Sequence, residues 1–144
     1  MSKSGMVVGV LVLGSICGLA IFAQDKPAAK DDADFPPRVV KTEPADRATG
    51  VDIRLREIKV TFDRPMSTEK AWSWMILVEQ GVYPGYRGGP EPRWENDGKT
   101  CVLAVRLSPD TVYAVGVNSP RNNGFRDVDG KVAVPYGWVF KTGK

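Results

Sequence analysis

Histidine is absent from this chain of 144 residues. Its absence removes the side chain that most often shuttles protons near neutral pH and most often binds metals. Catalytic triads that contain histidine and histidine-based zinc chemistry are therefore excluded. Runs of like charge are lacking as well, since 20 Lys and Arg and 17 Asp and Glu are scattered along the sequence with a net charge of +3. The sequence therefore predicts no binding to nucleic acid.

Cysteine is scarce, with one residue at position 17 and one at position 101. Cys17 lies in an apolar N-terminal stretch that we expect a signal peptidase to remove, so no intramolecular disulfide is predicted. Cys101 lies in a segment where apolar residues alternate as in a strand. We interpret Cys101 as a small buried apolar residue and not as a reactive thiol.

An almost unbroken apolar stretch follows Lys3 and ends at residue 23, where polar residues begin. This layout predicts a secretory signal peptide over residues 1–23. The stretch is also long enough to remain as an uncleaved membrane anchor. Lipidation at Cys17 is a third outcome, although Gly14 and Ile16 fit that motif poorly. All three place the folded part outside the cytoplasm, in the periplasm, on the cell surface or secreted, with membrane contact only through this segment.

Residues 24–37 are rich in charge, proline and alanine and contain one large apolar side chain. Such a segment buries too little surface to order itself, so we predict a flexible linker. Residues 38–144 are then long enough for one domain with a modest core. A hydrophobic content of 42%, with 15 glycines and 11 prolines, is typical of a globular domain with many turns.

Short segments with alternating apolar residues recur between turn residues throughout this domain. In residues 56–62, Ile58, Val60 and Phe62 alternate with polar side chains, as expected for an antiparallel strand with one buried face. We predict strands near 39–43, 56–62, 71–78, 93–95, 100–106, 113–117 and 136–142. No sustained helical period occurs, although a helical turn is compatible with residues 67–70. About seven strands predict an all-β, immunoglobulin-like antiparallel β-sandwich.

Two of these strands carry more specific expectations. Tyr113 begins its strand just after a proline turn, the position of a tyrosine corner, in which the hydroxyl bonds to an upstream backbone group. In the last strand, Trp138 and Phe140 are expected to point into the core. In the third segment, Trp72, Trp74 and Ile76 would share one face if the segment is extended.

Several motifs, taken in order, resemble a known family. The sequences RVVKTEPAD, ATGVD and IKVTFDRPM stand at 38–46, 48–52 and 58–66, and similar motifs follow at 107–113, 126–130 and 138–142. They resemble the SbsA-type bacterial immunoglobulin-like domain from residue 38 to residue 142. The resemblance implies a β-sandwich used as a spacer, interaction or surface-layer module in secreted bacterial proteins, without a catalytic site.

Three aromatic residues lie in or beside the glycine- and proline-rich stretch at 79–97, namely Tyr83, Tyr86 and Trp94. Exposed loop aromatics on a rigid sandwich can stack on sugar rings or on a partner. The alternative is a structural role, in which these side chains cover a sheet edge and the core beneath it. Of the three, Trp94 is expected to be the most buried. The three form our candidate ligand-binding site.

Asp127 and Asp129 would offer oxygen ligands to calcium in an exported protein. The stretch is too short for an EF-hand loop and no glutamate follows at the required position. The alternative is turn chemistry, since aspartate and glycine close tight turns.

The sequence gives only weak support for a catalytic pair of residues. Glu91 with Glu95 or Asp97 would need a cleft, and Ser67 with Lys70 has a Ser-x-x-Lys spacing without its companion motifs. We therefore predict no enzyme and no cofactor. The leading hypothesis is a non-catalytic exported module with a structural or protein-interaction role in the cell envelope, whose partner is an envelope protein or polysaccharide. The alternatives are a carbohydrate-binding module and a calcium-stabilised structural module.

Overall fold

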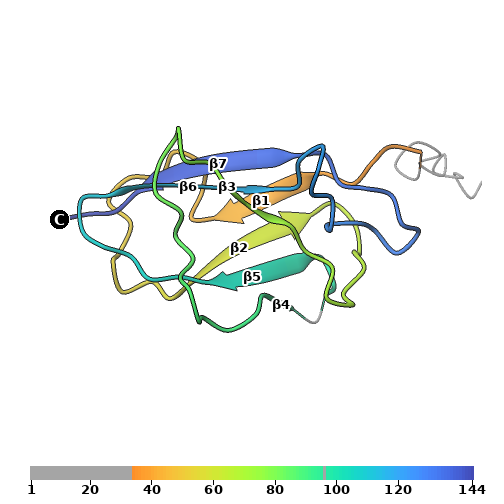
Figure 1. Cartoon of the computed structure of the whole chain (residues 1–144), viewed down its shortest axis with the longest axis horizontal. Coiled ribbons are helices and arrows are strands. Elements are labelled where there is room, and N and C mark those ends of the chain that lie inside the picture. The colour runs from red at the N-terminus through yellow and green to blue at the C-terminus, as the bar shows by residue number, and fades with distance from the viewer. Residues whose placement is uncertain (1–33, 96) are drawn as a thin grey trace, which may run out of the picture. The chain divides into compact units, whose positions relative to one another are not determined.

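A computed structural model describes residues 34–95 and 97–144, so the predicted signal peptide and most of the predicted linker lie outside the described residues. The described residues form seven strands (Figure 1). They are β1 (Val39–Glu43), β2 (Glu57–Phe62), β3 (Trp74–Ile76), β4 (Arg93–Trp94), β5 (Thr100–Ala104), β6 (Val112–Val117) and β7 (Tyr136–Lys141). The described part of the chain contains no helix that is long and apolar enough to cross a membrane.

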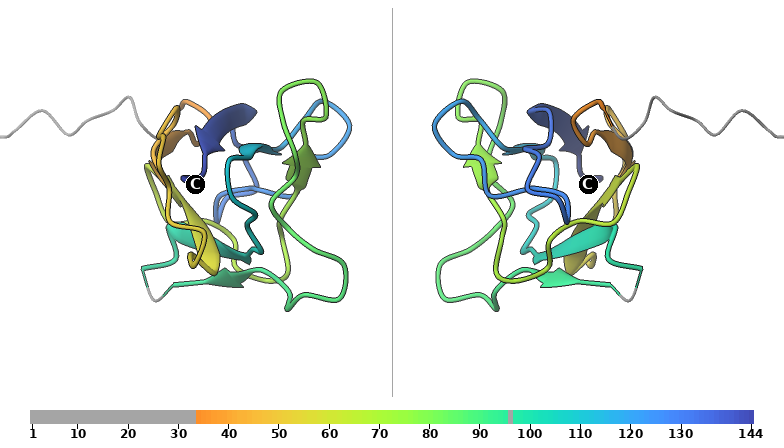
Figure 2. Two further views of the ribbon diagram at one scale, coloured as in Figure 1. Left: turned by 90° about the vertical axis from the view of Figure 1, so that its left-hand side faces the viewer. Right: turned by 90° about the vertical axis from the view of Figure 1, so that its right-hand side faces the viewer.

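The strands form two sheets, one in the order β1-β2-β5-β4 and the other in the order β3-β6-β7. Every pairing between these strands is antiparallel. Viewed along the strands in Figure 2, the two sheets lie on opposite sides of the domain. The predicted all-β, immunoglobulin-like sandwich is confirmed.

The core lies between the sheets and follows the predicted alternation. Ile58, Val60 and Phe62 of β2 are fully buried, and Trp138 and Phe140 of β7 are buried as predicted. In the register of β2 and β5, Ile58 lies opposite Leu103 and Val60 lies opposite Cys101. Because side chains alternate along a strand, this register aligns the apolar sets of both strands on one face. Cys101 is fully buried, which agrees with the prediction that it is an apolar core residue.

The tyrosine corner is present. The backbone N–H of Ser108 donates a hydrogen bond of 2.7 Å to the hydroxyl oxygen of Tyr113. The ring of Tyr113 also stacks on Phe140, with 5.5 Å between ring centroids. The predicted bond thus fixes the turn between β5 and β6 to the core.

The third strand is much shorter than the predicted segment from residue 71 to residue 78. It pairs with β6 only over Trp74–Ile76. At its end, the carbonyl of Leu77 accepts hydrogen bonds from the N–H groups of Gln80 and Gly81, which closes a turn and ends the pairing. A helical turn at residues 67–70 is also absent. The N–H of Ser67 bonds instead to the carbonyl of Arg126, and the N–H of Lys70, which has a φ of +47°, bonds to the carbonyl of Thr68 in a tight bend.

The packed domain begins earlier than residue 38. Pro37 is fully buried, and its carbonyl accepts a hydrogen bond from the N–H of Val134. The carbonyl of Phe35 accepts a hydrogen bond of 2.9 Å from the guanidinium of Arg64. The last residues that composition assigns to the flexible linker are therefore attached to the sandwich.

Candidate functional site: an aromatic pocket at the open edge of the sandwich

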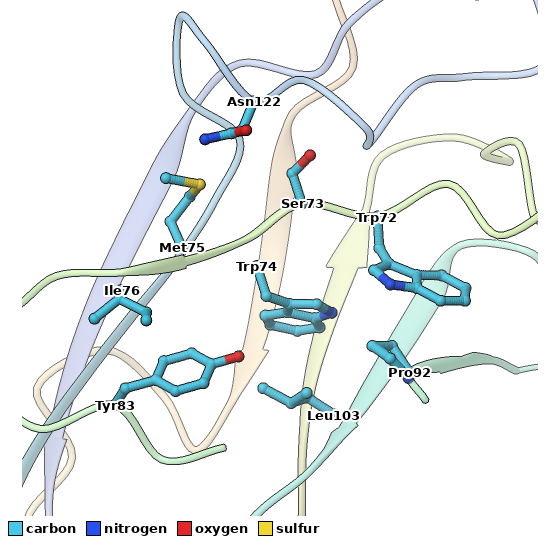
Figure 3. Close-up of a pocket in the computed structure, with 9 residues that line it drawn as sticks. All are labelled: Trp72, Ser73, Trp74, Met75, Ile76, Tyr83, Pro92, Leu103 and Asn122. Atoms are coloured by element: carbon cyan, nitrogen blue, oxygen red, sulfur yellow. The ribbon is translucent and has the colours of Figure 1, made fainter. Parts of the chain in front are cut away.

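The candidate site lies where two edge strands leave one side of the sandwich open. β3 is the edge of the three-stranded sheet and β4 is an edge of the four-stranded sheet. The long connection between them crosses from one layer to the other and is drawn in green in Figure 2. A pocket of about 600 Å³ lies on this side (Figure 3), lined by Trp72, Ser73, Trp74, Met75, Ile76, Tyr83, Pro92, Leu103 and Asn122. Its volume is within the roughly 300–1,000 Å³ of ordinary ligand pockets.

Three aromatic side chains form the walls of the pocket: Trp72, Trp74 and Tyr83 (Figure 3). All three are partly buried and pack against the core. The ring of Trp74 stands edge-on to Phe125, with centroids 5.5 Å apart, and lies 6.2 Å from Trp138. Because core aromatics support Trp74 from within, its position is fixed before any ligand arrives.

A close backbone approach places Asn122 beside β3. The N–H of Gly124 donates a hydrogen bond of 2.5 Å to the hydroxyl oxygen of Ser73, and the N–H of Asn118 donates one of 2.9 Å to the carbonyl of Ser73. A Cβ atom at Gly124 would lie only 2.5 Å from the carbonyl oxygen of Trp72. Glycine is therefore needed for the loop that carries Asn122 to reach the pocket.

A second close approach positions Tyr83. The N–H of Val82 donates to the carbonyl of Val112, and the N–H of Ala114 donates to the carbonyl of Val82, each at 2.9 Å. These bonds hold the connection against β6. A Cβ atom at Gly81 would lie 2.8 Å from the carbonyl oxygen of Val112, so this contact also depends on glycine.

The polar groups of the pocket are neutral, and several of them form no hydrogen bond with a described residue. None of the nine lining residues carries a charge. The indole N–H of Trp72, the hydroxyl of Tyr83 and the side-chain amide of Asn122 bond to none of the described residues. Burial raises the pKa of Tyr83, so its hydroxyl stays protonated in the physiological range. The pocket thus combines ring faces with neutral hydrogen-bonding groups that have no partner within the described domain.

Residues 33–142 match the family described as the bacterial Ig-like domain. The match covers most of the chain. This chain belongs to the bacterial Ig-like domain family. The finer resemblance to the SbsA type stays a prediction.

Two solved structures that are similar to this Ig-like domain have low sequence identity to it. CopC from Methylosinus trichosporium OB3b is 13% identical, with a TM-score of 0.53, over 74% of this chain and 93% of CopC. The N-terminal part of the bacterial S-layer protein SbsC is 20% identical, with a TM-score of 0.49, over 78% of this chain but only 24% of that protein chain. No protein of curated function matches the sequence.

The three aromatic residues singled out from the sequence of this Ig-like domain do not lie together. Of the three, only Tyr83 lines the pocket. Tyr86 instead lies under the guanidinium of Arg106, 4.2 Å from the ring centroid. Trp94 packs on Phe62, with 6.2 Å between centroids, and its indole N–H is buried without an acceptor among the described residues. Trp94 therefore acts as a core residue.

The two aspartates proposed for calcium have different roles in the Ig-like domain. Asp127 is 3% exposed, and its Oδ1 accepts hydrogen bonds from the N–H groups of Asp129, at 3.0 Å, and Lys131, at 2.9 Å. Its Oδ2 lies 3.7 Å from the guanidinium of Arg64. Asp129 is exposed on the turn. In the part of the chain that the structure describes, no group of three or more His, Cys, Asp or Glu residues is placed to hold a metal ion. The geometry is that of an aspartate that closes a turn.

Two of the carboxylates in the possible catalytic pairs hold structural contacts. Glu95 forms a part-buried ion pair with Lys59 across the sheet. The Oδ1 of Asp97 accepts hydrogen bonds from the N–H groups of Lys99, at 2.8 Å, and Thr100, at 3.0 Å, within the β4–β5 hairpin. These bonds lower the pKa of Asp97. Neither carboxylate is poised as a general acid.

Of the nine residues that line the pocket, sequence reasoning identified only Tyr83 as a site residue. Trp72, Trp74 and Ile76 were predicted only to share one face of an extended segment, and the structure shows that all three line the pocket, with Ile76 58% exposed. Asn122 lies far along the sequence and carries no motif. The available signal was the pair of tryptophans just before a long glycine- and proline-rich connection.

Proposed function

We propose that this chain is an exported, non-catalytic Ig-like module that binds a component of the cell envelope through the pocket of Trp72, Trp74 and Tyr83. The observation that carries the proposal is this pocket, where core-supported rings and unpaired neutral polar groups meet on one side of a rigid sandwich. Ligand sites commonly combine aromatic side chains with a few polar groups in this way.

A binding role suits the chemistry of the chain better than catalysis. Histidine is absent. The thiol of Cys101 is fully buried, and burial raises its pKa to about 12, so it is a poor nucleophile. Two of the carboxylates considered as catalytic groups, Glu95 and Asp97, already hold structural contacts. The sandwich therefore supplies a rigid surface rather than acid, base or nucleophile.

Export is supported by the N-terminal sequence, since a basic residue, an apolar stretch and a polar boundary follow one another as in secretory signals. An alkaline phosphatase fused after Lys144 tests it, because that enzyme is active only outside the cytoplasm. We expect an active fusion. An inactive fusion with a stable chain would reject the proposed location.

Site-specific photo-cross-linking tests the binding role. A benzophenone side chain at Ile76, which is 58% exposed at the pocket, is compared with one at Lys41 on β1, outside the pocket. We expect an adduct with an envelope component from position 76 and none from position 41. Equal adducts from both positions, or none from position 76, would count against the pocket as the binding site.

A further inference from the structure

We infer that the pocket holds a neutral sugar residue of a glycan. This inference rests on the proposed function, because it names the ligand of that same pocket. It depends on three features of the lining: the absence of charge, the orientation of the rings and the unpaired polar groups.

The absence of charge restricts the ligand. Nine residues line the pocket and none is acidic or basic. A carboxylate or phosphate placed there would lose hydration without gaining an ion partner, and this penalty is large in a partly buried site. Anionic polymers and charged peptide segments are therefore disfavoured relative to a neutral ligand.

The rings favour a ligand with flat apolar faces. Trp72, Trp74 and Tyr83 line the pocket, with Trp74 between the other two (Figure 3). The face of an aromatic ring carries partial negative charge, and it attracts groups that carry partial positive charge. The C–H bonds on the face of a pyranose ring are polarised in this way, so a sugar gains both apolar burial and this attraction.

The unpaired polar groups favour a ligand with hydroxyls. The indole of Trp72 donates only, the hydroxyl of Tyr83 donates and accepts, and the amide of Asn122 donates and accepts. None of the three bonds to a described residue. A purely apolar ligand would cover these groups and leave them unsatisfied, which costs free energy. Sugar hydroxyls, which also donate and accept, match the set.

Titration of the full-length chain with defined oligosaccharides tests the inference. The probes are cellohexaose, maltohexaose and mannohexaose, with hexagalacturonate as the anionic comparison. Binding is followed by calorimetry and by tryptophan fluorescence, because two tryptophans line the pocket. We expect at least one neutral oligomer to bind, with a change in emission, and hexagalacturonate to bind at least tenfold more weakly.

A double variant, Tyr83→Phe with Asn122→Ala, removes two polar groups of the pocket that bond to no described residue. Binding should weaken by about five- to one-hundredfold, since two hydrogen bonds are lost, while the thermal melt stays unchanged. The matched control is Tyr86→Phe, which removes a hydroxyl from the same connection outside the pocket and should leave binding within about twofold.

Three results would overturn the inference: no neutral oligomer binds, hexagalacturonate binds as tightly, or the double variant binds like the wild type. If one of these occurs while the benzophenone at position 76 still yields an envelope adduct, the proposed function stands and the sugar is rejected. If the adduct is missing as well, both are rejected.

Discussion

Removing the hydroxyl of Tyr113 tests the hydrogen bond of the tyrosine corner separately from the packing of the ring in the core. The Tyr113→Phe substitution keeps the ring and its stacking on Phe140 but deletes the acceptor of the 2.7 Å bond from Ser108. One hydrogen bond contributes about 0.5–1.5 kcal/mol net. Since Ser108 is exposed and water can replace the lost acceptor, we expect about 1 kcal/mol of destabilisation. For a domain of this size, that lowers Tm by roughly 4 °C.

Urea unfolding, followed by tryptophan fluorescence, measures this change. The midpoint should fall while the m-value stays constant, because the surface exposed on unfolding is nearly the same. Tyr86→Phe serves as the control, since the contact of Tyr86 with Arg106 involves the ring and not the hydroxyl. A Tyr113→Phe variant as stable as the wild type would show that the bond does not secure the β5–β6 turn.

Three further predictions concern single residues. Asp127→Ala leaves two turn N–H groups without their acceptor and should cost about 2–3 kcal/mol in urea unfolding, whereas calcium and EDTA should both leave the Tm of the wild type unchanged. Cys101 should resist Ellman's reagent at pH 8 in a folded Cys17→Ser chain and react at once in urea, because burial raises its pKa to about 12. Backbone hydrogen bonds lower the pKa of Asp97 below 3.8, so the stability difference between the wild type and Asp97→Asn should be full above that pH and shrink as the pH falls through the lower folded-state pKa.

The sandwich could be predicted from the sequence because its core strands follow strict alternation. Ile58, Val60 and Phe62 give period two without interruption, and all three are buried. The position of Tyr113 just after a proline turn likewise predicted its bond to the backbone. Such local patterns depend only on which face of a strand is covered.

The edges of the domain could not be predicted in the same way. β3 is shortened by a turn at Leu77, and residues 67–70 form no helical turn because Ser67 bonds to Arg126, nearly sixty residues further along the chain. Pro37 is buried by residues from other parts of the chain, and the composition of its own segment does not predict such contacts. Long-range contacts override local preference at all three places.

The site was predicted only in part, for a related reason. Tyr83 was identified from its place in the long connection, but the pocket depends on which segments the fold brings beside it. Asn122 reaches β3 because Gly124 permits a close backbone contact with Trp72. Neither the position of the edge strands β3 and β4 on one side of the sandwich nor this contact leaves a periodic signal in the sequence.

Photo-cross-linking from position 76 in living cells, with and without the Tyr83→Phe and Asn122→Ala substitutions, tests the binding site most directly. The account predicts an envelope adduct in the otherwise unchanged chain and its loss in the double variant, with both proteins equally folded. An adduct of equal yield in both, or none in either, would contradict the assignment of the pocket as the functional site.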